Sequence, residues 1–118
     1  HSDIFTDSYV VRKKFDSLMR RASGEKIFIE NQNQSVEVYY YSDGSTTIDR
    51  YMRFYKSNDK MLLEYGTLSP ESVINREIVC GNVSKCTFHQ AGRAVQLILE
   101  LDNGTQKNTV VTSAIAHN

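Results

Sequence analysis

The amino-acid sequence predicts an α+β fold, in which an N-terminal amphipathic helix packs on an antiparallel β-sheet or sheets of about six or seven strands. Three observations predict this class. Apolar side chains near the N-terminus recur at helical spacing, later segments alternate apolar and polar side chains, and turn signals separate those segments. With 118 residues, the chain has the size of a single domain, residues 1–118.

The predicted helix covers residues 1–23, because its apolar side chains recur alternately four and three positions apart and therefore share one face. This stripe consists of Ile4, Val11, Phe15, Leu18 and Ala22, with Ser8 completing the row. Charged residues take the opposite face. Arg20 and Arg21 lie in the last turn, where cations complement the helix dipole, and Gly24 can take the left-handed conformation that ends a helix.

The start of this helix is less clearly marked. Asp3 and Thr6 are both candidate N-caps, since the side-chain oxygen of either residue type can accept a hydrogen bond from a free backbone N–H. Neither a polar linker nor a targeting segment precedes them. We therefore expect the chain to be a shortened version of a longer protein, whose missing piece is a membrane or filament anchor.

Residues 26–65 predict a first β-meander, whose strands alternate in character and are separated by turns. Between positions 35 and 41, for example, Val36 and Val38 alternate with Glu37. The side chains expected on the face away from the helix include Tyr39, Tyr41, Tyr51, Arg53 and Tyr55. This face is either an interaction surface, which uses aromatic area and hydroxyl groups, or ordinary cross-strand packing among neighbours.

Residues 69–84 are expected to cross between two parts of the sheet. Pro70 lies near the start of this segment, and we interpret its surroundings as the entry to one irregular or helical turn. Residues 86–115 predict the C-terminal hairpins. The Asn-Gly pair at 103–104 is the strongest turn signal in the sequence, because these residues readily take the positive φ angles of a tight hairpin.

Composition excludes several classes of protein. Lys and Arg together number 14, and so do Asp and Glu, so the chain has no net field to collect phosphates, and we expect no direct nucleic-acid partner. No apolar run approaches the roughly 20 residues needed to cross a bilayer. Seven tyrosines and five phenylalanines, with no tryptophan, favour an antiparallel sheet with one wetted face.

Cys80 and Cys86 are the only cysteines, and they close a short loop. A disulfide between them is expected if the chain is exported, and two reduced, partly buried thiols are the alternative. A zinc site would need two more ligands at compatible spacing, whereas the three histidines are scattered, so we expect no metal. The spacing is also too wide for a redox-active pair.

The sequence offers little for catalysis. A nucleophilic triad needs an oriented base, and His89, within a predicted strand, is expected at a surface or edge position. Four strand carboxylates are expected to face water separately, namely Glu37, Asp49, Glu64 and Glu100. No Gly-rich phosphate loop occurs. We therefore expect a protein without enzymatic activity and without a cofactor.

The order of these parts resembles the type IV pilin and pseudopilin superfamily, particularly its larger minor subunits of the J or W kind. Residues 9–22 are similar to the soluble end of the pilin helix. Residues 78–83, followed by residues 86–88, are similar to an asparagine-valine and then phenylalanine element that precedes the final hairpin in such subunits. The similarity spans nearly the whole chain, and it implies a pilin-like fold.

This resemblance implies a structural subunit of an extracellular type IV pilus, or of a related secretion or DNA-uptake filament. Its helix would dock into the filament and its β-domain would be exposed. Other pilin or pseudopilin subunits would be its partners. Family members begin with a hydrophobic segment that carries a glutamate, and this sequence lacks it. The resemblance therefore implies a cell-surface protein that is anchored in the membrane before assembly through a missing N-terminal segment.

A different class of protein remains open. A cystatin-like or nuclear-transport-factor-like fold also wraps one helix with a curved sheet, and such a free-standing binding module would hold a ligand at the tyrosine-rich surface. An enzyme, as a third interpretation, would need a buried His89 with a carboxylate partner.

Overall fold

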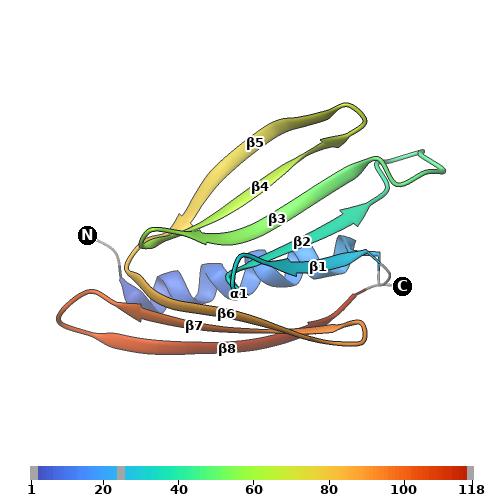
Figure 1. Ribbon diagram of the computed structural model, residues 1–118. Helices are drawn as coiled ribbons and strands as arrows, with labels where there is room; N and C mark the ends of the chain where they lie inside the picture. Colours follow the sequence, from blue (N-terminus) through green and yellow to red (C-terminus); the bar gives the residue numbers. More distant parts are fainter. Residues whose placement is uncertain (1–2, 24–25, 117–118) are drawn as a thin grey trace.

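The computed structural model describes residues 3–23 and 26–116, which form one α-helix and eight β-strands in two antiparallel sheets (Figure 1). The helix is α1 (Ile4–Arg21). The first sheet has the order β1-β2-β3-β4-β5, with strands β1 (Ile27–Glu30), β2 (Ser35–Tyr40), β3 (Arg50–Ser57), β4 (Lys60–Leu68) and β5 (Glu71–Cys80). The second has the order β6-β7-β8, with strands β6 (Val83–Ala91), β7 (Ala94–Asp102) and β8 (Lys107–Ile115).

The α+β class, with an N-terminal helix packed on antiparallel sheets, is therefore confirmed. The predicted number of six or seven strands was wrong, since the described residues form eight. The additional strand is β5, in the segment that was expected to cross between two parts of the sheet. Pro70 follows a cis peptide bond in the two-residue turn between β4 and β5, and it does not lie at the start of a helix.

Helix α1 begins at a well-formed cap. The carboxylate of Asp3 accepts hydrogen bonds from the backbone N–H of Phe5 at 2.9 Å and from the hydroxyl of Thr6 at 3.2 Å. Asp3 is thus the N-cap, and Thr6 is one of the groups that it binds. The helix ends where Ala22 becomes extended, with its N–H bonded to the carbonyl of Met19. Gly24, the expected end signal, lies outside the described residues.

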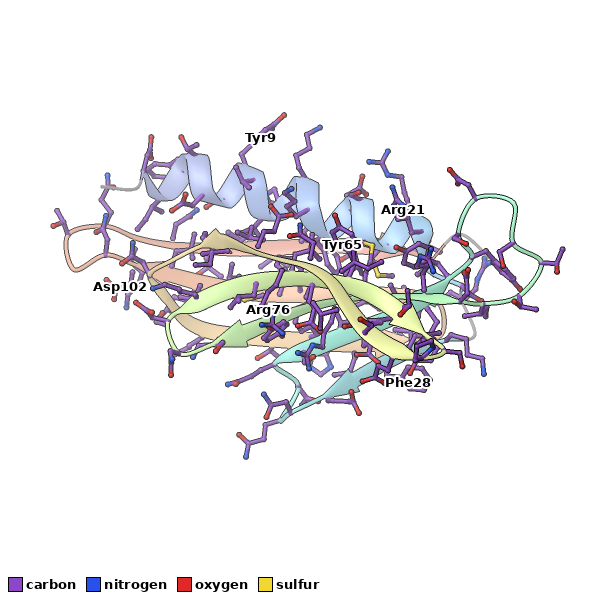
Figure 2. All side chains as sticks on the ribbon, turned by 90° about the horizontal axis from the view of Figure 1, so that it is seen from above. Tyr9, Arg21, Phe28, Tyr65, Arg76 and Asp102 are labelled. Carbon is purple, nitrogen blue, oxygen red and sulfur yellow. The ribbon has the colours of Figure 1, made fainter. Side chains whose placement is uncertain are left out.

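The apolar stripe of α1 faces the core. Its five predicted members, Ile4, Val11, Phe15, Leu18 and Ala22, are all fully buried. The helix lies along one side of the two sheets (Figure 2). It packs against β8 in one sheet and against β5 and β2 in the other. The helix therefore covers one side of both sheets along its whole length, which explains why its stripe is continuous from the first turn to the last.

Three phenylalanines join the layers at the centre of the core. The ring of Phe88, on β6, lies 6.2 Å from that of Phe15 on α1 and 6.3 Å from that of Phe54 on β3. The backbone N–H of Phe88 also donates to the carbonyl of Asn33, in the turn between β1 and β2, at 2.8 Å. Phe88 therefore connects the helix and both sheets.

A short link carries the chain from one sheet to the other. β5 ends at Cys80 and β6 begins at Val83, so the crossing takes place within residues 81–82. The N–H of Val83 donates to the carbonyl of Asp59 at 2.8 Å, and the N–H of Asp102 donates to the carbonyl of Asn82 at 2.9 Å. The link is thus bonded to both sheets.

Within the described residues, no helix is long and apolar enough to span a lipid bilayer.

We expect Phe88→Ala to lower the free energy of unfolding by about 3–5 kcal/mol, because it removes a buried ring and leaves a cavity where three elements meet. Guanidinium denaturation followed by circular dichroism measures this loss. Phe5→Ala is the matched control, since Phe5 is 61% exposed, and its effect should stay within about 0.5 kcal/mol. Similar losses for the two variants would contradict the central role of Phe88. Should Phe88→Ala not fold, Phe88→Leu gives a smaller loss in the same direction.

Candidate functional site

A row of side chains crosses all the strands of the first sheet on the face turned away from the core. The register places Phe28 on β1 opposite Glu37 on β2, then Arg53 on β3, Glu64 on β4 and Arg76 on β5. The last four residues of this row are alternately negative and positive. Opposite charges on neighbouring strands attract at these distances, so the row is an ordered polar surface, which we call the outer face.

Glu64 is the centre of this outer face. Its carboxylate accepts hydrogen bonds from the hydroxyl of Tyr51 at 2.7 Å and from Nε of Arg76 at 2.8 Å, and Nη2 of Arg53 lies 3.4 Å away. The Glu64 side chain is only 6% exposed, although it belongs to an outward-facing position. These donors compensate for the loss of water around a buried charge, so the carboxylate can remain ionised.

The pKa values reflect this arrangement. Burial alone would raise the pKa of Glu64, but the hydrogen bonds from Tyr51 and Arg76 and the charges of both arginines outweigh it and lower the pKa below 4.5. Burial and the bond to Glu64 raise the pKa of the Tyr51 hydroxyl. The tyrosine hydroxyl therefore stays protonated and donates a hydrogen bond to the carboxylate across the neutral pH range.

An aromatic ring and a carboxylate hold Arg53 in place. Its guanidinium lies 4.1 Å from the centre of the Tyr55 ring, which is a cation–π distance, and Nη2 lies 3.4 Å from the carboxylate of Glu64. Within the described part of the chain, Nε of Arg53 is buried and has no hydrogen-bond partner. Part of the side chain remains exposed. On the same face of the sheet, the rings of Phe28 on β1 and Tyr39 on β2 lie 5.2 Å apart.

A hollow of about 230 Å³ opens beside this cluster. Tyr51, Arg53 and Glu64 line one side, and residues 71–73 of β5 line the other. Gly66 makes the close approach possible, because a Cβ at this position would lie 2.0 Å from the carbonyl oxygen of Ser72 and 2.8 Å from the Tyr51 ring. The absence of a side chain at Gly66 thus lets the ring lie over β4.

The hollow is acidic at its rim. Glu37 and Glu71 line it together with Glu64. Burial raises the pKa of Glu37, with further contributions from the charges of Glu30 and Glu71, whereas a hydrogen bond from Tyr39 and the charge of Arg53 act in the opposite direction. The arrangement offers carboxylates and aromatic edges to a cationic or hydrogen-bond-donating group.

The structure brings four of the five predicted surface residues together. Tyr39, Tyr51, Arg53 and Tyr55 all lie on the outer face, whereas Tyr41 lies beyond the end of β2 and is exposed apart from them. Tyr51 is only 5% exposed, so it packs across strands and forms part of the wall of the hollow. Cross-strand packing therefore describes Tyr51, and the interaction surface formed by the other members stays a prediction.

Sequence reasoning missed the central residue and its partner. Glu64 was expected to face water, and Arg76 was placed in a crossing segment, so the pair could not be anticipated. The alternation of Met61, Leu63 and Tyr65 with Glu64 indicates the outward direction, but the burial of Glu64 depends on β5. A hairpin at the Pro70 turn would by itself pair Glu64 with Asn75, and only the bulge at Ile74 brings Arg76 opposite Glu64.

The remaining predicted polar residues lie elsewhere. Asp49 accepts hydrogen bonds from the N–H of Ser42 at 2.8 Å and from its hydroxyl at 2.6 Å, and these bonds lower its pKa. Glu100 accepts a bond from the hydroxyl of Ser84 at 2.7 Å. His89 is exposed on β6 opposite Gln96. These carboxylates therefore bond locally, and His89 is not the buried base that a triad requires.

The two cysteines are free thiols, and the expected disulfide is not formed in the structure. Cys80 is the last residue of β5 in the first sheet, whereas Cys86 lies within β6 in the second. Both thiols are buried in the core, and Sγ of Cys86 lies 3.9 Å from the carbonyl oxygen of Gln34. The separation of six positions in the sequence does not reveal that the two thiols lie in different sheets.

Across residues 3–23 and 26–116, no three His, Cys, Asp or Glu side chains gather in a way that could hold a metal ion. The chain matches no protein-family model, no curated protein and no solved structure. The outer face and its hollow are therefore characterised by their own geometry alone.

We expect Glu64→Gln to lower the free energy of unfolding at neutral pH by about 1.5–3 kcal/mol, since it weakens hydrogen bonds to a charged group. The pKa of Glu64 is lower in the folded protein, so its contribution is present above pH 4.5 and is lost as the pH falls through the folded value. Denaturation curves between acid and neutral pH should thus be flatter for this variant than for the wild type. Asp43→Asn, at an exposed position after β2, is the control and should leave the pH profile unchanged.

Thiol labelling tests the state of the cysteines. Burial raises the pKa of Cys80 to about 11 and that of Cys86 to about 12, and only the thiolate reacts readily. We expect both thiols of the native protein to react with a disulfide reagent at about pH 8 at least roughly a hundredfold more slowly than in denaturant. Two thiols should appear on unfolding without reductant. Release of thiols only after reduction would instead establish the bridge that the sequence predicts.

Proposed function

We propose that the protein is a non-enzymatic structural subunit, a minor pilin or pseudopilin, of an extracellular type IV pilus or of a related secretion or DNA-uptake filament. In this proposal, α1 docks into the filament and the sheets form the exposed head. The described fold, with one helix lying along antiparallel hairpin sheets, is compatible with both roles.

The main support for this proposal comes from the outward face of α1. Phe5 is 61% exposed and Tyr9, one turn later, is 60% exposed. Tyr9 points away from the sheets (Figure 2), and Nζ of Lys13 lies 5.4 Å from the centre of its ring. Large apolar side chains side by side on an exposed helix are typical of a surface that contacts another protein.

The helix is held firmly enough to serve as a docking element. Nη1 of Arg12 donates to the carbonyl of Val111 on β8 at 2.9 Å, and Nζ of Lys14 lies 3.1 Å from the carboxylate of Glu77 on β5. The apolar stripe of α1 is buried against the sheets of the same chain. We therefore assign the filament contact to the outward face, and the stripe to the attachment of the head.

Partners and location follow from the same proposal. Other pilin or pseudopilin subunits would contact α1, and a hydrophobic segment before α1 would anchor the protein in the membrane until assembly. The head would then lie outside the cell. Reading the codons that precede residue 1 in the gene tests this directly, since the proposal requires a hydrophobic segment there.

A free-standing binding module is the second candidate. The hollow beside Tyr51 and Glu64 favours it, because concave sites with a few fixed polar groups are typical of ligand sites. Such a module, with a cystatin-like or nuclear-transport-factor-like arrangement of helix and sheet, would work alone in solution. The two candidates differ in whether the protein is found in filaments.

We expect a labelled copy of the full-length protein to lie on surface filaments of the parent organism in electron micrographs. The double variant Phe5→Asp, Tyr9→Asp should reduce its amount in sheared filaments by roughly tenfold or more, because exposed aromatic anchors dominate protein contacts. Both residues are exposed, so the fold should be retained. Ile115→Asp, at a residue that is 66% exposed on β8, is the matched control. Uniform cytoplasmic staining of the wild-type protein would count decisively against the filament.

A further inference from the structure

Strand β5 is an edge with a free side. It ends the order β1-β2-β3-β4-β5, so among the described residues only one side of its backbone has a strand partner. Residues 71–76 are all exposed. Figure 1 shows β5 at the outer margin of the sheet. β5 also contacts α1, with Lys14 bonded to Glu77, but this ion pair lies beyond the exposed stretch. A row of free backbone groups can bind one kind of occupant well, another extended strand.

The side chains of β5 fit such an occupant. Val73 and Ile74 are large, apolar and about half exposed at the middle of the free stretch. The charges of the strand beyond them are partly neutralised within the molecule, because Arg76 bonds to Glu64 and Glu77 to Lys14. An approaching strand therefore meets apolar surface at its centre and no strong excess of one charge.

The side chains of β5 are complementary to those of a second β5 strand that runs antiparallel to it. Ile74 is an extra residue in the ladder, since Val73 is opposite Gly66 and Asn75 is opposite Tyr65. This bulge keeps Glu71 and Arg76 on the same face of the sheet although they are five positions apart. In an antiparallel pair centred between Val73 and Ile74, Glu71 of each strand lies opposite Arg76 of the other.

We propose that a second copy of this chain pairs with β5 in this register and forms a continuous sheet across a twofold axis. Ser72 then lies opposite Asn75, and the apolar pair Val73 and Ile74 occupies the centre. The guanidinium of Arg76 has five N–H donors, of which the Nε bond to Glu64 uses one, so it can also bind the carboxylate of Glu71 from the second copy. An isologous contact of this kind forms each pair twice.

The contact is small, because it joins two short stretches of strand. Interfaces of this size belong to the weak, reversible class, so the dimer forms at micromolar or higher concentration. The inference goes beyond the filament proposal and does not depend on it, since it concerns the protein alone in solution.

Sedimentation equilibrium tests the dimer. We expect the average mass of the purified protein to rise from 13.5 kDa toward twice that value as its concentration is raised from about 1 µM to about 1 mM. Glu71→Arg and Ile74→Lys should each weaken association by roughly tenfold, the first by placing like charges opposite each other and the second by burying a charge at the centre. Glu30→Arg and Ile115→Lys make the same changes at exposed positions elsewhere and should have no effect.

Charge exchange tests the register. Glu71→Arg and Arg76→Glu should each associate with itself more weakly than the wild type, whereas a mixture of the two should associate more tightly than either alone, because each introduced side chain meets an opposite charge on the other copy. Circular dichroism confirms that each variant is folded, and if Arg76→Glu is not, the Ile74→Lys result decides. A mass of 13.5 kDa at every concentration would overturn the proposal. So would a dimer that neither Glu71→Arg nor Ile74→Lys weakens.

Discussion

The packing of Phe88 between Phe15 and Phe54 is the contact on which the rest of the structure depends. Neither the helix nor the three-stranded sheet would be stable on its own. An isolated helix of 18 residues is only marginally stable in water, and a three-stranded sheet needs a covered apolar face. At Phe88 the helix, the five-stranded sheet and the three-stranded sheet bury the same surface together. The orientation of the outward face of α1, and of the outer face of the larger sheet, follows from this arrangement.

Glu64 has a comparable role at the surface. A single carboxylate holds Tyr51 on β3 and Arg76 on β5, and so it ties the edge strand to the middle of the sheet. The net contribution of such a buried charge to stability is modest, because desolvation offsets much of the attraction. Its main effect is to fix the positions of the side chains that surround the hollow.

Periodicity was enough to predict the elements that bury one face. The stripe of α1 and the alternating strand β7 are both visible in the sequence, because the core demands apolar residues at regular spacing. β5 was missed for a physical reason. Both of its faces are largely exposed, and the bulges at Ile74 and Val79 shift the alternation twice. The burial of Glu64, which is at an outward position, depends on that strand and could not be derived without it. The cysteine pair was likewise judged by its spacing in sequence, whereas its two members belong to different sheets.

The link at residues 81–82 has a mechanical consequence. Two residues span at most about 7 Å, and this link is hydrogen-bonded to the turn before β4 and to the end of β7. It therefore leaves no slack between the sheets. Because α1 contacts strands of both sheets, tension that enters through the helix is applied to both of them.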